Sequence, residues 1–314
     1  MRGLSAARRA LRRVLAEGEG EYGYSATNDS SEQPGPDGLM DLSEVLEVAT
    51  RTDAGMVRAH NEDAIFANPA QGIVILADGM GGYNAGEVAS SMATALLGGE
   101  LEQSLARGLR GRIDHGGKAI AHALIEAEID RVNNAIYTAA QNRPEYHGMG
   151  TTLVAALFFD NAMTVAHIGD SRLYRLRGDA FKQLTRDHSL LQEQIDSGLM
   201  TREQARHSQN KNLVTRALGV DPEVEAEIRD YDSAPGDIYL LCSDGLSDMV
   251  EDGEIARTVQ TLSANPELCA AQLVQMANDR GGRDNISVVL VRIRDAYPAA
   301  RGWWSRLFAW FTRS

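Results

Sequence analysis

The chain has 314 residues, 43% of them hydrophobic, and a formal net charge of −13 with a pI near 5.0. This hydrophobic content is sufficient for a substantial core in one large domain or two small ones. The acidic balance argues against a nucleic-acid-binding protein, because such proteins present a basic face. Cys242 and Cys269 fall in different predicted elements, and we expect buried free thiols rather than a disulfide.

Residues 1–43 are predicted to form a tether without a core of its own. Residues 1–13 are basic, whereas residues 14–47 carry nine acidic residues and no Lys or Arg, a composition typical of disordered linkers. The basic start lacks the apolar stretch of a secretory signal, and no run reaches the ~18 apolar residues that span a bilayer. We therefore expect a cytoplasmic protein that contacts the inner face of the membrane, if at all, through its C-terminal tail.

The folded domain is expected to span residues 44–295 and to contain strands with helix pairs between them. Strands are predicted near residues 45–50, 64–67, 72–77, 151–159, 162–168, 171–177, 225–231, 237–243 and 285–293. Helical periodicity covers residues 84–106, 118–141, 188–208 (as short helices), 251–262 and 266–279. Strands that follow one another closely, with helix pairs grouped between them, indicate antiparallel sheets covered by helices, which is an α+β fold.

Five aspartates lie at the ends of the most apolar segments. Asp78, Asp170 and Asp244 follow predicted strands, whereas Asp63 and Asp284 precede them. If the two kinds of strand run antiparallel, all five carboxylates gather at one sheet edge. Like charges at close range repel or raise one another's pKa, so such a cluster requires cations. Oxygen ligands in this number suit Mg²⁺ or Mn²⁺, and the sequence therefore predicts a metal site.

Eight short motifs, in order over about residues 46–294, resemble those of the metal-dependent protein phosphatases of PP2C type, and the bacterial single-domain branch in particular. They are Arg58-x-x-Asn-Glu-Asp63, Asp78-Gly-Met-Gly-Gly82, Gly150-Thr-Thr-Leu153, Ile168-Gly-Asp-Ser-Arg172, Thr185-Arg-Asp-His188, Val214-Thr-Arg-Ala-Leu-Gly219, Ser243-Asp-Gly-Leu-Ser-Asp248 and Gly282-Arg-Asp-Asn-Ile286. One tetrapeptide is weak evidence, but eight in order are specific. The resemblance implies an α-β-β-α sandwich, in which two packed antiparallel sheets are flanked by helices and the metals lie at one end.

The resemblance also implies a ligand set for two core ions of Mn²⁺ or Mg²⁺. Asp78 would bridge the two ions, and the Gly79 carbonyl would serve the second. Asp244 and Asp284 would complete the shell of the first ion, and either Glu62 or Asp63 that of the second. Taken alone, a strand-end aspartate is more often a turn cap.

A third, weaker ion is implied beside the core pair. Asp170 resembles its ligand and would share it with Asp244. Asp248 would join them unless its side chain instead caps the helix expected after Met249.

The implied reaction is direct hydrolysis of phosphoserine or phosphothreonine on proteins. Two ions bridged by Asp78 would hold a water, lower its pKa and neutralise phosphoryl charge during in-line attack. Arg58 matches the phosphate-binding arginine, because a guanidinium can grip two phosphoryl oxygens at once. Met80 stands where eukaryotic members often have a general-acid histidine, so the leaving group would take its proton from water on the metal. His60 and His188 are less suited to that role.

The flap over the active site corresponds to residues 190–213, where Arg202, Arg206 and Lys211 are candidates for contacts with a phosphopeptide. The expected partners are phosphorylated proteins and a cognate Ser/Thr kinase that the enzyme opposes, and the chain is expected to be a monomer. Two alternatives stay open. One is a non-catalytic phosphoprotein-binding module of the same fold, and the other is a hydrolase of small phosphate esters.

The C-terminal tail, residues 296–314, is predicted to contain an amphipathic helix over residues 301–314. Its large apolar residues fall within roughly 160° of a helical wheel: Trp303, Trp304, Leu307, Phe308, Trp310 and Phe311. Arginines occupy the opposite face. Such a helix suits a membrane surface or a partner groove, and docking onto the chain's own domain is the third option.

Deletion of residues 300–314 is expected to leave phosphatase activity intact and to move the protein into the soluble fraction, because the deleted segment carries the apolar face and lies outside the catalytic motifs. Cell fractionation with immunoblotting measures the distribution. Unchanged fractionation would remove the membrane interpretation.

Overall fold

The computed structural model describes residues 41–82, 85–109, 113, 118–201, 204, 208 and 213–298. Most of the predicted tether, the helix expected over residues 301–314 and the flap residues Arg202, Arg206 and Lys211 lie outside the described residues. Within the described part, none of the helices combines the length and the hydrophobicity that a membrane span requires.

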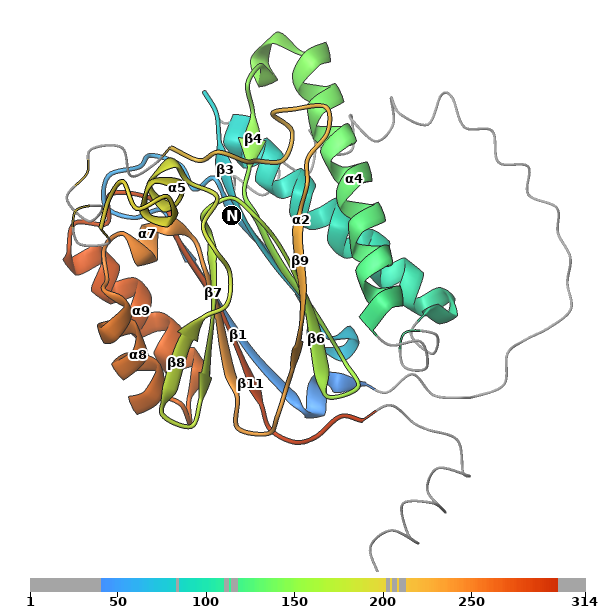
Figure 1. The fold of residues 1–314 in the computed structure, drawn as a ribbon, viewed down its shortest axis with the longest axis vertical. Helices are drawn as coiled ribbons and strands as arrows, with labels where there is room; N and C mark the ends of the chain where they lie inside the picture. Colours follow the sequence, from blue (N-terminus) through green and yellow to red (C-terminus); the bar gives the residue numbers. More distant parts are fainter. Residues whose placement is uncertain are drawn as a thin grey trace, which may run out of the picture.

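Two antiparallel sheets pack face to face, with helices on both outer sides (Figure 1). The first sheet has the order β1 (Leu46–Asp53), β11 (Ile286–Ile293), β10 (Ile238–Cys242), β7 (Arg172–Arg177), β8 (Ala180–Gln183). The second has the order β2 (Asp63–Asn68), β3 (Ile73–Met80), β5 (Leu153–Phe159), β6 (Ala162–Ile168), β9 (Glu227–Asp232), and β4 (Gly150–Thr151) pairs with β3. Helices α2 (Ala85–Ser104) and α4 (Lys118–Asn142) cover the second sheet, while α8 (Asp252–Thr261) and α9 (Pro266–Asp279) cover the first. The predicted α+β sandwich is confirmed.

The central strands are apolar along their whole length because both of their faces are buried. In β3, Ile73 and Ile75 pack with the helices of the second sheet, whereas Val74 and Leu76 join the cluster between the two sheets. Successive side chains of a strand point to opposite faces, so both sets need apolar residues. A third cluster fills the space between the first sheet and α8 and α9. The sandwich therefore has three apolar layers.

The turn between β5 and β6 shows how local sequence sets the register. Asp160 and Asn161 form a two-residue loop in which both have positive φ, 40° and 53°. Tight hairpins need this conformation at both positions, and Asp and Asn tolerate it better than most residues. The break predicted between residues 159 and 162 is therefore confirmed.

Several element boundaries differ from the sequence-based expectation. The strand expected over residues 151–159 is divided at Thr152 into β4 and β5, and β8 was not expected. Ser243 does not end β10 but is the N-cap of a short helix, α7 (Asp244–Ser247). Only α5 (Leu190–Asp196), capped by Ser189, is described as an α-helix element in the region 188–208.

Truncation of the layer between the sheets is expected to destabilise the protein strongly. Leu241 in β10 is 0% exposed within this layer, so Leu241→Ala should lower the free energy of unfolding by about 2–5 kcal/mol. Leu268→Ala in α9 is the matched control, because Leu268 is 51% exposed and its change should stay within about 0.5 kcal/mol. Urea denaturation measures both, and equal losses would contradict the assignment of the core.

Candidate metal centre

The five strand-end aspartates come together at one end of the sandwich. Asp63 and Asp78 are directly opposite each other on the antiparallel strands β2 and β3. Asp170 follows β6, Asp244 opens α7 directly beyond β10, and Asp284 precedes β11. The charges of Asp63, Asp244, Asp170 and Asp284 all raise the pKa of Asp78, after burial as the largest cause. The predicted convergence is therefore present, but the single sheet edge is not: Asp63, Asp78 and Asp170 come from the second sheet, and Asp244 and Asp284 from the first.

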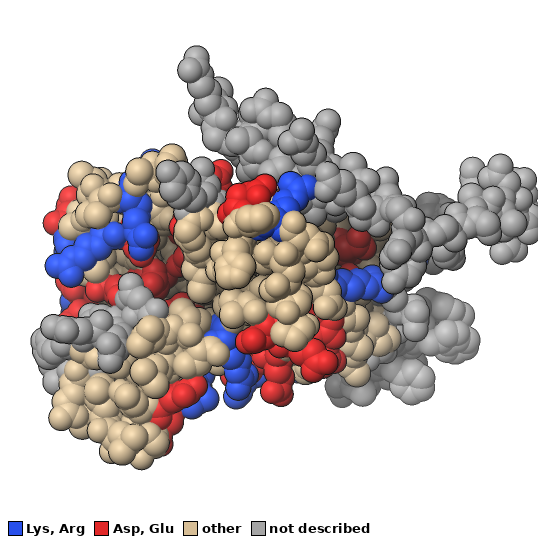
Figure 2. Space-filling view, turned by 90° about the horizontal axis from the view of Figure 1, so that it is seen from above, with Lys and Arg blue, Asp and Glu red and all other residues tan. Residues whose placement is uncertain are grey.

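A cleft opens over this cluster. Figure 2 looks onto the molecule from this end and shows acidic side chains in a hollow between tan lobes. The cleft is lined by seven of the nine residues that the sequence assigns to the site: Arg58, Glu62, Asp78, Gly79, Asp170, Asp244 and Asp284. Met80 lines it as well.

The backbone around Asp78 is fixed by two threonines of the Gly150-Thr-Thr-Leu153 motif. The Asp78 N–H donates to Thr152 Oγ1 at 3.0 Å. The Asp78 carbonyl accepts from the Thr152 N–H and from Thr151 Oγ1, both at 2.9 Å. The Thr152 hydroxyl also bonds the Ser171 hydroxyl at 2.8 Å, beside Asp170. The two threonines thus position two carboxylates at once.

Gly79 lies where two backbone segments meet. Its N–H donates to the Glu62 carbonyl at 3.1 Å, and a Cβ at this position would lie 2.1 Å from the Gly86 carbonyl oxygen at the start of α2. A larger residue would have to displace backbone. Glycine is therefore required here for close approach.

The two carboxylate oxygens of Asp63 have different surroundings. Its Oδ2 accepts from the Ser243 hydroxyl at 2.9 Å, and Ser243 Oγ in turn accepts from the Ser287 N–H at 3.0 Å. Its other oxygen, Oδ1, is buried and has no hydrogen-bond partner among the described residues. Buried polar atoms are almost always satisfied, so this oxygen is a candidate ligand for a cation.

Burial and mutual repulsion make the cluster hold protons when no cation balances it. Burial is the largest cause that raises the pKa of Asp63 to about 6 and that of Asp170 to about 7. Burial, followed by the neighbouring carboxylates, raises the pKa of Asp244 well above its usual range. Divalent ions with oxygen ligands would replace those protons and remove the repulsion. The donor set therefore fits Mn²⁺ or Mg²⁺.

Asp248 lies with Asp170 and Asp244 in a subcluster. Its charge raises the pKa values of both neighbours. Asp248 is the C-cap residue of α7, and its N–H donates to the Asp244 carbonyl at 2.8 Å. The next helix, α8, has Glu251 at its N-cap, so the alternative that Asp248 caps the following helix is wrong.

Arg58 pairs with a carboxylate, although its side chain is 51% exposed. Its Nη2 lies 2.7 Å from Asp284 Oδ2, and this hydrogen bond is the main cause that raises the pKa of Arg58. No sequence pattern predicts this pairing, because 226 positions separate the two residues. A bound phosphate would compete with Asp284 for the guanidinium.

The loop that carries Arg58 is clamped by Asn285, whose role sequence reasoning missed. The Asn285 Nδ2 donates to the carbonyls of Ala54 and His60, and its Oδ1 accepts from the Glu62 N–H at 2.8 Å. Asn285 belongs to the Gly282-Arg-Asp-Asn-Ile286 motif, which was the available signal. It joins the Arg58 loop to the segment that carries Asp284.

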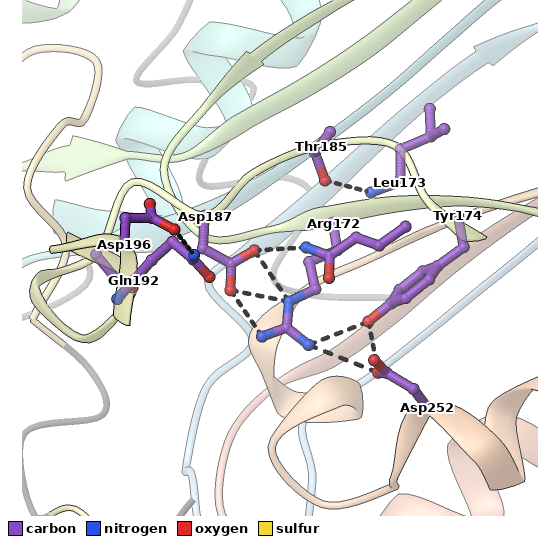
Figure 3. Close-up of polar contacts among 10 residues, drawn as sticks. Arg172, Leu173, Tyr174, Thr185, Asp187, Gln192, Asp196 and Asp252 are labelled. Carbon is purple, nitrogen blue, oxygen red and sulfur yellow. Dashed lines mark hydrogen bonds and ion pairs between the residues drawn. The ribbon is translucent and has the colours of Figure 1, made fainter. Parts of the chain in front are cut away.

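A second missed element is a half-buried arginine network around Arg172 (Figure 3). Arg172 forms a two-pronged ion pair with Asp187, with Nη2 2.6 Å from Oδ2 and Nε 3.0 Å from Oδ1. Its Nη1 donates to the Tyr174 hydroxyl, which donates to Asp252. Bidentate pairs of this kind fix geometry as well as charge. The network joins the segment after β8 to the first sheet through Arg172, which lies two residues after Asp170.

Neither of the two histidines considered as a general acid, His60 and His188, lines the cleft. His60 is exposed. His188 is buried, and its Nδ1 accepts from the Gly169 N–H at 3.2 Å. Met80, which cannot donate a proton, occupies the cleft instead.

The comparisons with known proteins agree with the fold and the motifs. The family model for protein phosphatase 2C matches residues 56–281, and the chain belongs to this family. It is 40% identical over 247 residues to the serine/threonine phosphatase Stp of Listeria innocua, covering 77% of this chain and 93% of that protein. It is also 40% identical over 253 residues to the serine/threonine protein phosphatase PstP of Mycobacterium tuberculosis, covering 80% of this chain and 46% of that one.

Solved structures show the same architecture. The crystal structure of the catalytic domain of PstP in complex with two manganese ions aligns with a TM-score of 0.70 at 39% identity, covering 80% of this chain and 99% of that one. The phosphatase Stp1 of Staphylococcus aureus aligns with a TM-score of 0.68 at 34% identity, covering 81% and 98%. The metal-dependent phosphatase fold is therefore shared along the described domain.

The raised carboxylate pKa values predict how stability depends on pH when metal is absent. Asp170 binds its proton more tightly in the folded state, so its contribution to stability is lost as pH rises from about 3.8 to about 7. In chelator, wild type should therefore lose stability relative to Asp170→Asn across this window. Urea denaturation at several pH values measures the difference, and a constant difference would contradict the burial of this carboxylate.

Proposed function

We propose that the carboxylate cluster is the metal centre of a phosphatase that hydrolyses phosphoserine and phosphothreonine on proteins. The observation that carries the proposal is the convergence of the strand-end carboxylates, with Arg58 beside them in the same cleft. The similar proteins of Listeria and Mycobacterium are named serine/threonine phosphatases. The mycobacterial catalytic domain, 39% identical to this chain, was solved with two manganese ions.

The residues that would hold the core ions are those that line or underlie the cleft. Asp78 would serve both ions, with the Gly79 carbonyl and Glu62 or Asp63 on one side and Asp244 and Asp284 on the other. When bound, the ions supply positive charge opposite the phosphoryl oxygens and lower the pKa of water. Asp170, Asp244 and Asp248 would hold a third ion, because the charge of Asp248 raises the pKa values of both Asp170 and Asp244, and the charge of Asp170 raises that of Asp244.

Arg58 would bind the phosphoryl group and hold it for in-line attack. Its pairing with Asp284 is partly exposed, with 51% and 26% of the two side chains accessible, and such pairs contribute little to stability. A phosphate dianion can therefore compete for the guanidinium and engage two of its N–H groups. Release of Asp284 would at the same time free its carboxylate for a cation.

The surroundings of Arg58 favour a protein substrate over a small phosphorylated metabolite. Met56 and Val57, which precede Arg58, are 71% and 68% exposed. Their loop is fixed, because the Met56 N–H donates to the Gly282 carbonyl at 2.7 Å and a Cβ on Gly55 would meet the Asp284 carbonyl oxygen. These two exposed apolar side chains are held in place beside the phosphate-binding arginine. They suit contact with an apolar side chain of a peptide better than contact with a sugar.

The physiological setting extends this proposal. The enzyme would oppose a Ser/Thr kinase, act as a monomer and reach a membrane surface or a partner protein through residues 301–314. The described domain, residues 44–295 with its flanking segments, would carry the catalytic function.

A comparison of substrates tests the function. Wild type should hydrolyse a phosphothreonine peptide in Mn²⁺, show no metal-free turnover in chelator, and prefer the peptide to sugar phosphates. Asp244→Asn should lower peptide turnover at least about 10-fold, because it removes a metal ligand. Asp179→Asn, in the exposed turn between β7 and β8, is the matched control and should retain wild-type turnover.

Phosphate release in a steady-state assay measures the turnover of the peptide and of sugar phosphates, each in Mn²⁺ and in chelator. A preference for sugar phosphates would overturn the protein-substrate assignment. Binding of the phosphopeptide without turnover would identify a non-catalytic module, and full activity of Asp244→Asn would contradict the ligand assignment.

A further inference from the structure

Exposed hydrophobic side chains concentrate at the rim of the carboxylate cleft. The described part of the chain exposes six large hydrophobic side chains, and four of them lie in segments that border the cleft: Met56, Val57, Leu213 and Val220. Hydrophobic residues scattered singly over a surface need no explanation, whereas their concentration around one cleft indicates a binding surface. The rim therefore has a second apolar part besides Met56 and Val57.

The centre of this second part is Val220, which lies beside Met80. A Cβ on Gly150 would lie 2.7 Å from Val220 Cγ2 and 3.6 Å from Met80 Cγ, so both side chains are on the same side of this glycine. Met80 lines the cleft, and Val220 is 50% exposed. Because Gly150 has no side chain of its own, Met80 and Val220 form an open apolar surface at the edge of the cleft.

The loop that carries Val220 is fixed to α4 by Asn133, which is 1% exposed. The Asn133 Oδ1 accepts from the Gly219 N–H at 2.8 Å. Its Nδ2 donates to the carbonyls of Asp221 and Pro222, at 3.1 and 3.3 Å. Gly219 has a φ of 82°, a conformation that glycine adopts without strain. Val220 is thus held in a defined position, as Met56 and Val57 are.

The two apolar loops lie on opposite sides of the cleft. Helix α4, which holds the Val220 loop, covers the second sheet (Figure 1). The Met56 N–H donates to the carbonyl of Gly282, which lies just beyond α9 on the side of the first sheet. The cleft is between them, where carboxylates from both sheets meet. Packed sheets are about 10 Å apart, so an extended peptide needs more than about three residues to pass from one loop to the other.

We propose that Met80 and Val220 form a second apolar subsite, which binds a side chain of the substrate on the side of the phosphorylated residue opposite to that bound by Met56 and Val57. This inference rests on the proposed phosphatase function and adds the direction in which the substrate crosses the cleft. An extended chain would run from the α9 side of the sandwich to the α4 side, with its phosphoryl group between the two subsites. The preferred substrates are then segments with apolar residues on both sides of the phosphoserine or phosphothreonine.

The separation of the two loops favours an extended polypeptide as the occupant. A sugar phosphate is too short to touch both loops while its phosphoryl group lies at the carboxylate cluster. A peptide with residues on both sides of the phosphate reaches both loops. Because both loops are already fixed, their contact with the peptide requires little ordering of the enzyme, and each contact removes apolar area from water.

Peptides with leucine on defined sides of the phosphothreonine test the proposal. Four peptides of equal length and charge carry, within four residues of the phosphothreonine, alanines only, leucines on the N-terminal side, leucines on the C-terminal side, or leucines on both sides. For wild type in Mn²⁺, leucines on either side should raise kcat/KM at least about 4-fold through a lower KM, the effect of burying about one methylene group. Val220→Asn should remove the preference for leucine on one side, and Val57→Asn the preference for leucine on the other.

Leu268→Asn in α9 is the matched control, because Leu268 is 51% exposed but does not line the cleft. This variant should keep both preferences. Turnover of the alanine peptide by wild type reports the proposed function itself, and no turnover of any of the four peptides would contradict that function.

Three outcomes would overturn the subsite while leaving the phosphatase function in place. One is turnover of all four peptides by wild type at equal kcat/KM. Another is loss of the preference for the same side in Val220→Asn and Val57→Asn, which would contradict the arrangement of the loops on opposite sides. The third is self-association of wild type in analytical ultracentrifugation that Val220→Asn abolishes, which would assign the apolar surface to a second copy of the chain.

Discussion

Electrostatic repulsion between buried carboxylates is the constraint on which the rest of this structure depends. Antiparallel pairing of β2 and β3 places Asp63 directly opposite Asp78, and like charges directly opposite on paired strands destabilise a sheet. Asp170, Asp244 and Asp284 approach the same point from other strands and raise the pKa of Asp78 further. The fold tolerates this arrangement only because cations or protons can balance it. A site of this kind breaks the usual rules of burial where function requires it.

The surrounding structure holds the carboxylates in place against that repulsion. Thr151 and Thr152 fix the backbone of Asp78, Ser243 holds one oxygen of Asp63, and Asn285 joins the Arg58 loop to the Asp284 segment. These supports come from strand ends, which three apolar layers make rigid. The positions of the ligands are thus set by packing and by neutral hydrogen bonds rather than by the metal alone, which is how preorganised sites are built.

Much of the fold and the centre of the site follow from the sequence. Strands buried on both faces appear as continuous runs of Val and Ile, and aspartates at their ends identify the metal edge once antiparallel pairing is assumed. Features set by distant contacts do not appear in the pattern. The Arg58–Asp284 pair, the Asn285 clamp and the Arg172 network each join segments that only the folded chain brings together. His167 and Glu227 face each other through the register of β6 and β9, which hydrophobic periodicity does not define. Short elements such as α7 and β8 are too brief to leave a periodic signal.

The central claim is that the strand-end carboxylates share divalent ions in one hydrolytic centre. Anomalous diffraction from crystals grown in abundant Mn²⁺ tests it most directly, because manganese positions are then located independently of the protein. The account predicts two strong peaks in the cleft with an Asp78 oxygen bound to both. Carboxylates spread apart with no manganese between them would contradict it.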